Sequence, residues 1–256
     1  MSALLIVLAA SVVAFALLET RFGARRRADT RHVRTDLAYV ASDFAGNLAV
    51  NALRPGFPLA LAWLFGQAWQ GPVAGWHPLA QFALGAVVLE WAIWFTHWCW
   101  HRFDVLYPFH AVHHASTHVY FLSGLRQHPV QFVGDQVFFA LLLTLIGVQP
   151  ELVGLLATLQ MVLAFFTHSN LDLRLRGGLK YVVASPRFHV LHHDRSGRGD
   201  YKNLGGGLSL FDWLFGTALD PDEVAPPEAL GSGDPTVPPG WRGQLLWPFR
   251  ALRRAS

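Results

Sequence analysis

Apolar segments of membrane-spanning length alternate with short polar segments along this chain. The first runs from Ser2 to Leu18, close to the length of about 20 residues that a helix needs to cross the hydrocarbon of a bilayer. Leu79 to Thr96 is a second such segment, and Val130 to Val148 and Leu152 to Thr167 are two more, joined by a short polar turn. The pattern predicts four membrane helices, of which the last two form a hairpin.

A further apolar region, Leu37 to Trp69, is interrupted by three residues that kink or end helices: Pro55, Gly56 and Pro58. Its polar residues recur at every fourth position and therefore line one helical face: Asp43, Asn47 and Asn51. We expect this face to pack against other helices or to lie at the interface. The region is interpreted as one crossing plus an interfacial or re-entrant piece, which brings the chain to about five spans.

The polar segment that follows the first apolar one is strongly basic. Asp29 is its lone acid among six arginines: Arg21, Arg25, Arg26, Arg27, Arg31 and Arg34. By the positive-inside rule this loop is cytoplasmic. The apolar segment before it lacks a basic start and a small-residue cleavage site, so we expect an uncleaved anchor.

The composition changes again after residue 218. Residues 219–240 are rich in proline, glycine and acids, which predicts a loop. Trp241 to Arg254 mixes aromatic residues with arginines and resembles an interfacial anchor. We therefore expect an anchor with a basic cytosolic loop at 1–36, a membrane-embedded catalytic domain at 37–218, and a loop with an interfacial tail at 219–256.

The overall composition supports a multi-pass membrane protein. Of 256 residues, 52% are hydrophobic and 14% are charged, whereas an average soluble domain has about 25% charged residues. The net charge of +3 comes from arginines at the edges of apolar segments, which favours contact with a membrane surface and argues against a nucleic-acid partner. The single cysteine, Cys99, excludes an internal disulfide and a cysteine-rich metal site.

Histidines carry the candidate chemistry. The chain has 13 of them, and one spacing occurs twice, in His110-Ala-Val-His113-His114 and His189-Val-Leu-His192-His193. Positions i, i+3 and i+4 share a helical face, so we expect each triplet to direct three imidazoles at one point. Imidazole is the commonest protein ligand for transition metals. The repeated spacing therefore predicts a metal centre.

Three more histidines are expected at the same depth. His97 and His101 lie one helical turn apart at the end of the Leu79 segment, and His168 lies at the end of the last apolar segment. Because a hairpin returns the chain to the side that it left, all three are expected beside the two triplets on the cytoplasmic side. The nine histidines are sufficient for two metal ions.

The remaining polar candidates have weaker support. His32 and His77 are interpreted as surface residues, whereas His118 and His128 could support a ligand, and His128 is the candidate tenth ligand. Glu90 lies seven residues before His97 and is predicted to orient an imidazole from its N–H side, with an acid paired elsewhere as the alternative. Asp194 and Asn203 could orient ligands or water, although a solvated loop is the default for both.

Taken together, the motifs resemble the fatty acid hydroxylase/sterol desaturase superfamily. The likeness extends from about Glu90 to Thr217 and includes the histidine motifs, Ser185-Pro-Arg-Phe before the second triplet, and Asn203-Leu-Gly after it. It implies an all-α bundle of membrane helices with a cytosolic di-iron centre that uses O2 and external electrons to hydroxylate or desaturate a lipid or sterol-like substrate. The implied ligands of the two irons are the nine histidines: His97, His101, His110, His113, His114, His168, His189, His192 and His193.

The departures from that superfamily concern the electron source and the tenth ligand. The His-Pro-Gly-Gly haem signature of fused relatives is missing, so electrons are expected from a separate reductase, ferredoxin or cytochrome b5-like protein. Asp172 stands where some relatives complete a second HxxxH pair with His168. A zinc-dependent hydrolase and a b-type haem electron carrier are the alternative functions. The expected location is a bacterial inner membrane with the active site facing the cytoplasm.

Overall fold

The chain is all-helical in the ranges that its computed structural model describes, residues 3–25, 28–65 and 69–255, which confirms the predicted fold class. Apart from isolated bridges, these ranges contain no β-structure. The helices are α1 (Ala3–Phe22), α2 (Thr30–Leu53), α3 (Gly56–Phe65), α4 (Pro78–Arg102), α5 (Tyr107–His114), η1 (Phe121–Leu125), α6 (Pro129–Ile146), α7 (Pro150–Thr167), η2 (Gly177–Tyr181), α8 (Pro186–Val190), α9 (Leu210–Phe215) and α10 (Trp241–Ala255).

Four helices in the described ranges are long and apolar enough to cross a membrane: α1, α4, α6 and α7. They coincide with the four apolar segments identified in the sequence. Three of them, α4, α6 and α7, begin at a proline, whose fixed φ and missing N–H suit the first helical position. The α4 helix continues to Arg102, so His97 and His101 are held on a rigid helix rather than in the loop after it.

The α2 helix differs from the prediction at both ends. It begins at Thr30, because the Asp29 side chain accepts a hydrogen bond from the His32 backbone N–H and caps the helix. The chain breaks at Pro55, as expected, but Pro58 lies inside α3. Since α2 does not meet the length and hydropathy criterion for a span, the fifth crossing stays a prediction.

Only part of the polar face predicted for this region is buried. Asp43 is buried, Asn47 is half-buried and Asn51 is exposed. The α2 helix packs closely on α6, because a Cβ added at Gly46 would lie 2.9 Å from the Phe132 ring. The absence of a side chain at Gly46 therefore sets how closely these two helices approach.

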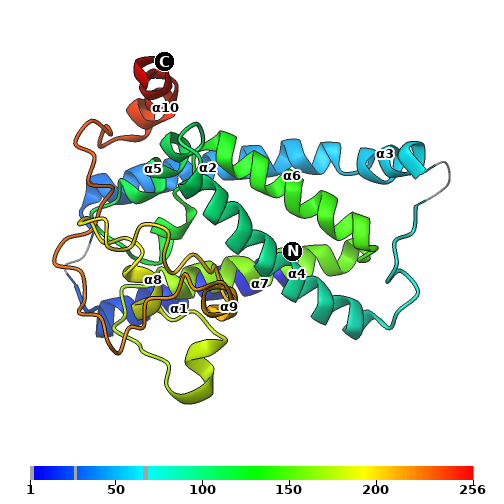
Figure 1. Cartoon of the computed structure of the whole chain (residues 1–256), viewed down its shortest axis with the longest axis horizontal. Coiled ribbons are helices and arrows are strands. Elements are labelled where there is room, and N and C mark those ends of the chain that lie inside the picture. Colours follow the sequence, from blue (N-terminus) through cyan, green and yellow to red (C-terminus); the bar gives the residue numbers. More distant parts are fainter. Residues whose placement is uncertain (1–2, 26–27, 66–68, 256) are drawn as a thin grey trace.

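The helices alternate in direction between two ends of the bundle (Figure 1). The α2 and α3 helices lead away from the end that holds α5 and α8, which we call the histidine end; α4 returns to it, α6 leads away and α7 returns. At the opposite end, Trp69 Nε1 donates to Leu145 O at 2.9 Å. There Gly71 has φ +77°, and a Cβ on it would lie 2.4 Å from the Gly147 nitrogen.

The end of α1 also lies at the histidine end. Ala24 N donates to Asn170 O at 2.9 Å, and Glu19 accepts hydrogen bonds of 2.8 Å from the Phe121 and Asn170 N–H groups. The basic segment after α1 and the histidine motifs are therefore at one end of the bundle, as the parity of crossings requires. Arg26 and Arg27 of that segment lie outside the described residues.

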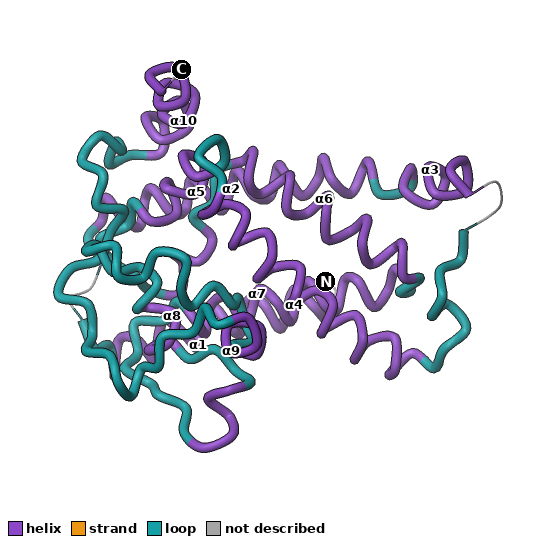
Figure 2. The backbone as a smooth tube through the Cα atoms, in the orientation of Figure 1, coloured by secondary structure: helices purple, strands orange, loops and turns teal. Residues whose placement is uncertain are grey.

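Loops and short helices cover the histidine end (Figure 2). They include residues 219–240, which form turns and irregular structure as expected from their composition. The α10 helix follows them and packs Trp247 against Tyr39 of α2 and Val112 of α5. Its docking on α5 leaves Leu246 and Phe249 exposed.

Candidate metal centre

The nine predicted histidines come together in two adjacent groups. The first group has five members, His97, His101, His110, His114 and His192, and the second has four, His113, His168, His189 and His193. Within each group the ligand atoms lie within 4.8 Å of one another. The groups touch, since the rings of His114 and His193 have centroids 4.8 Å apart.

Each triplet is divided between the two groups, which corrects the expectation that its three imidazoles meet at one point. In α5, His110 and His114 belong to the first group and His113 to the second. Neighbouring residues on a helix point about 100° apart, so His113 and His114 diverge. The second triplet is divided at the same positions, since His189 and His193 belong to the second group and His192 to the first, although His192 and His193 lie in the turn after α8.

In most of the imidazoles, the hydrogen bond made by the outer nitrogen, the one that faces away from the group, determines which ring nitrogen carries the proton. In five ligands Nδ1 faces an oxygen that only accepts: Leu204 O for His97 (2.7 Å), Lys202 O for His192 (2.8 Å), Ala164 O for His168 (3.0 Å), Arg126 O for His113 (3.2 Å) and Gln131 Oε1 for His110 (3.2 Å). The Nδ1–H must therefore donate, which leaves Nε2 with a free lone pair. These lone pairs are directed into the groups.

The inner nitrogens face one another at distances that suit a shared metal ion. His110 Nε2 lies 3.0 Å from His97 Nε2 and 3.1 Å from His114 Nε2. In the second group His168 Nε2 lies 3.0 Å from His189 Nε2 and 3.3 Å from His113 Nε2. Two Nε2 atoms cannot hydrogen bond to each other when neither carries a proton. A metal cation bound between them would give both lone pairs a partner.

The second group also contains orphaned nitrogen atoms. Both ring nitrogens of His193 and Nδ1 of His189 are buried without a hydrogen-bond partner among the described residues. A buried imidazole nitrogen without a partner loses its solvation and gains nothing in return. The residues present therefore fit a pair of metal ions bound by nitrogen, with the donor set that zinc, copper and iron accept.

Burial keeps these ligands neutral. His110, His113, His114, His189, His192 and His193 are each at most 5% exposed. Desolvation, reinforced by neighbouring imidazoles, lowers the pKa of all six well below the ordinary value for histidine. The ligands outside the membrane helices are thus unprotonated at neutral pH and ready to bind a metal.

One loop, residues 202–208, positions two ligands of the first group through its carbonyls, those of Lys202 and Leu204. Two buried carboxylates clamp this loop. Asp212 accepts from the Leu204 N–H (2.9 Å) and the Gly205 N–H (2.7 Å). Glu90, on α4, accepts from the Gly207 N–H (3.0 Å) and the Leu208 N–H (2.9 Å). The structure thus gives Glu90 backbone partners where we expected an imidazole, and its contact with the ligands is indirect.

The two other acidic or amide candidates also bind the chain rather than an imidazole. Asn203 donates to Phe188 O at 2.7 Å and accepts from the Leu219 N–H at 2.6 Å, so it joins α8 to the segment that follows α9. Asp194 accepts from the Ser196 N–H and pairs with Arg198, which closes the turn after the second triplet.

Four histidines lie outside both groups. His128, the candidate tenth ligand, caps α6 by accepting from the Val130 N–H with Nδ1 and donates from Nε2 to Leu245 O, so neither nitrogen is free. His118 packs on His32 with ring centroids 4.4 Å apart, and its role in supporting a ligand stays a prediction. His77 accepts from the Leu79 N–H at the start of α4.

Several supporting residues escaped the sequence analysis. Asp36 and Arg126 form a fully buried ion pair, and the Tyr120 hydroxyl donates to the same carboxylate at 2.6 Å. The pair ties α2 to the carbonyl that His113 contacts. Gln131 orients His110, and its place four residues before Asp135 in an apolar helix is the one signal that could have identified it.

Comparison with known proteins identifies relatives. The fatty acid hydroxylase family model matches residues 82–217, which include every ligand of both groups. The chain is 26% identical over 218 residues to ornithine lipid hydroxylase OlsE of Rhizobium tropici, covering 84% of this chain and 65% of the relative. It is 31% identical over 132 residues to alkylglycerol monooxygenase of Danio rerio, covering 51% and 29%.

The human alkylglycerol monooxygenase is 26% identical over 154 residues, covering 60% of this chain and 32% of that enzyme. The chain thus spans less than two thirds of the length of these relatives. No solved structure matches the chain.

Proposed function

Because the chain belongs to the fatty acid hydroxylase family, we propose that it is a membrane oxidoreductase that hydroxylates a C–H bond of a lipid with O2, two iron ions and external electrons. The observation that carries this proposal is the pair of buried groups of inward-facing imidazole nitrogens. The relatives that match are named as a lipid hydroxylase and as alkylglycerol monooxygenases, which favours hydroxylation over desaturation.

The five-member group would hold one iron and the four-member group the other. When bound, the metals supply the activation of O2 that inserts one oxygen atom into a C–H bond. Nine neutral imidazoles add no negative charge, which keeps the metals electrophilic. The outer hydrogen bonds, such as that from His97 to Leu204 O, hold the rings in place before a metal arrives.

The overall reaction defines what else the enzyme needs. One atom of O2 enters the product and the other leaves as water, so each turnover takes up two electrons and two protons. A separate reductase, ferredoxin or cytochrome b5-like protein would supply the electrons. The positive segment near α1 supports a cytoplasmic histidine end in a bacterial inner membrane, where such donors reduced by soluble metabolism are available.

The assay for this function is lipid mass spectrometry of cells that express the chain. With isotopically labelled O2, we expect a membrane lipid to gain one labelled oxygen atom. Loss of two hydrogen atoms without gain of oxygen would instead identify a desaturase. No change in any lipid, with metal bound and a donor protein present, would contradict the proposal.

The metal content and the optical absorption spectrum of the purified protein separate the proposal from its alternatives. The purified protein should contain two irons per chain and show no strong Soret band, because a Soret band would mean haem. A protein that binds zinc under iron-replete, anaerobic purification and hydrolyses a lipid ester would support the hydrolase instead.

A further inference from the structure

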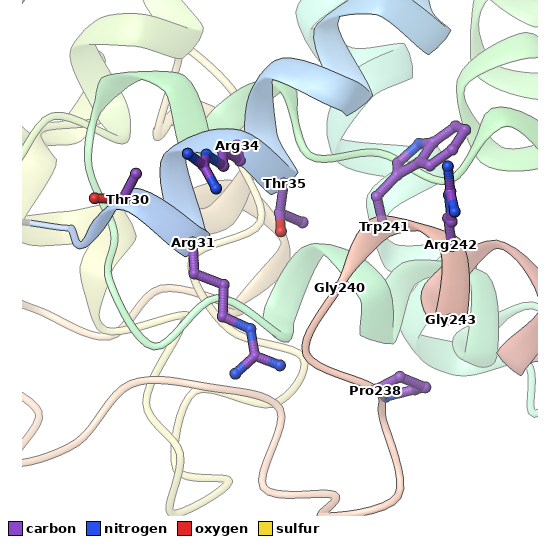
Figure 3. Close-up of a pocket in the computed structure, with 9 residues that line it drawn as sticks. All are labelled: Thr30, Arg31, Arg34, Thr35, Pro238, Gly240, Trp241, Arg242 and Gly243. Atoms are coloured by element: carbon purple, nitrogen blue, oxygen red, sulfur yellow. The ribbon is translucent and has the colours of Figure 1, made fainter.

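A second polar feature lies outside the metal centre and is lined by none of its histidines. An open cleft of about 1000 Å³ lies between the start of α2 and the start of α10. Three arginines line it: Arg31 and Arg34 from α2, and Arg242 from α10 (Figure 3). No Asp or Glu is among the lining residues. The cleft therefore concentrates positive charge.

These guanidinium groups have no internal counter-ion. Among the residues that the structure describes, none of the three arginines pairs with a carboxylate. The two nearest acids in sequence have other partners: Asp29 is hydrogen bonded to His32, and Asp36 pairs with Arg126. The peptide dipoles of α2 and α10, both of which start at the cleft, add partial positive charge at the same place.

The outer face of α10 indicates where the cleft lies relative to a bilayer. Arg242, Leu246, Phe249 and Arg253 follow one another at intervals of three or four residues and so share one face. Leu246 is 54% exposed, and Phe249 is 45% exposed although one side of its ring packs on Phe109 of α5. Such a face, apolar in the middle with arginines at both ends, suits the boundary between acyl chains and headgroups. Arg242 is then at the level of lipid phosphates.

We propose that this cleft binds the phosphate of an anionic phospholipid headgroup at the membrane surface. Guanidinium groups match phosphate oxygens in geometry and charge, and three of them line this cleft with no carboxylate among the lining residues. A concave cleft fits a headgroup better than it fits the convex surface of an acidic protein, and the neighbouring apolar face supplies the acyl-chain contact. This site is independent of the metal centre and of turnover.

The test is a native mass spectrometry titration of the purified full-length protein with phosphatidylglycerol and, separately, phosphatidylcholine. We expect phosphatidylglycerol to bind more tightly. The triple variant Arg31→Gln, Arg34→Gln, Arg242→Gln should bind phosphatidylglycerol at least about tenfold more weakly, because each charge-assisted bond contributes a large part of a tenfold factor. Its affinity for phosphatidylcholine, in which the choline cation offsets the charge of the phosphate, should fall much less.

The matched control removes the same charge elsewhere. Arg174, Arg176 and Arg195 are exposed and lie outside both the cleft and α10. The variant Arg174→Gln, Arg176→Gln, Arg195→Gln should keep phosphatidylglycerol affinity within about twofold, since distant surface charges are screened. If the cleft triple variant does not fold, Arg242→Gln alone is measured, with at least about fivefold weaker binding expected.

Three results would overturn the proposal. The first is equal phosphatidylglycerol affinity in the wild type and the cleft variant. The second is binding of glycerol 3-phosphate as tight as that of the lipid, which would assign the cleft to a soluble phosphate compound. The third is unchanged lipid binding together with lost binding of an acidic plant-type ferredoxin, which would assign the cleft to a protein.

Discussion

His97 and His192 donate their outer N–H groups to carbonyls of one loop, and that loop is held by the carboxylates of Asp212 and Glu90. Two ligands of the five-member group therefore depend on residues that do not approach a metal position. Such supporting contacts set ring orientation and ligand basicity, and their loss commonly costs tenfold to a hundredfold in metal affinity.

The Asp212→Asn variant tests this dependence. The amide nitrogen of Asn cannot accept the Gly205 N–H that the carboxylate accepts at 2.7 Å, so a buried donor is left unpaired at a cost of about 1–3 kcal/mol. We expect a lower thermal midpoint and about tenfold weaker metal affinity, measured by chelator competition.

Asp222→Asn is the control for that change. Asp222 is 39% exposed and pairs loosely with Lys180, at 3.5 Å, and with Arg174, at 3.9 Å. Surface pairs of this kind are worth about 0–1 kcal/mol, so stability and metal affinity should both stay near those of the wild type. Equal losses in the two variants would mean that Asp212 has no special role.

The unequal size of the groups leads to a second prediction. His192→Ala leaves four ligands in the first group, whereas His193→Ala leaves three in the second. We expect His193→Ala to lose about one of the two metals and His192→Ala to retain more, and both together to lose nearly all metal. Metal analysis by mass spectrometry of anaerobically purified protein measures this.

His77→Ala serves as the control, because His77 caps α4 outside both groups and its loss should leave the metal content unchanged. The relative metal content of the His192→Ala and His193→Ala variants tests which histidine belongs to the smaller group. More metal in the His193→Ala protein than in the His192→Ala protein would contradict the division into groups of four and five.

The sequence indicates the ligands at this scale but not their supports. Nine histidines stand out because their spacing repeats and few other residues in apolar segments are polar. Asp212 does not stand out, since its partners are backbone N–H groups seven and eight residues away in a folded loop. Glu90 was identified as a supporting residue, but its partners depend on a loop 117 residues further along the chain.

Between elements, the buried Asp36–Arg126 pair connects α2 to η1, next to the carbonyl that faces His113. Removing one partner of a buried pair leaves an uncompensated charge, which costs about 3–5 kcal/mol. We therefore expect Asp36→Ala to lower the thermal midpoint strongly in detergent.

The double variant Asp36→Leu, Arg126→Met distinguishes a charge effect from a packing effect. Replacing both partners with apolar side chains of similar volume leaves no buried charge, so it should recover much of the lost stability. If the double variant is no more stable than Asp36→Ala, the pair acts through hydrogen bonds and shape rather than charge balance.

The long helices could be predicted from the sequence, because each is an apolar segment of membrane-spanning length. The bounds of α4, α6 and α7 were found to within a few residues at their starts because a proline fixes each first turn. The start of α2 was missed because Asp29, read as one acid in a basic loop, is a helix cap. The division of the triplets was missed because neighbouring helical positions i+3 and i+4 point about 100° apart, so two histidines that share a broad face can still serve different groups.

For the whole molecule, cysteine labelling measures which side of the membrane the histidine end faces. In a Cys99→Ser background, single cysteines can replace Arg26, Ser196 at the histidine end, or Gly75 at the opposite end, where a side chain meets open space. We expect an impermeant thiol reagent to label position 75 in intact spheroplasts and positions 26 and 196 only after lysis.

Comparing the labelling of positions 26 and 196 distinguishes an error in the membrane orientation from an error in the number of crossings. Positions 26 and 196 should always label together, because Arg25, the described neighbour of position 26, contacts Asn170 at the histidine end, where Ser196 also lies. If both label from outside, the orientation is reversed and the fold stands. If they label from opposite sides, the parity of crossings inferred for the chain is wrong.

The division of each triplet also sets an order on how the centre is completed during synthesis. A nascent chain that has emerged through His168 already carries four of the five ligands of the first group, but only two of the four ligands of the second. Residues 189–193 then supply one ligand to the first group and two to the second. One metal position can therefore load early, while the other waits for the final segment to dock.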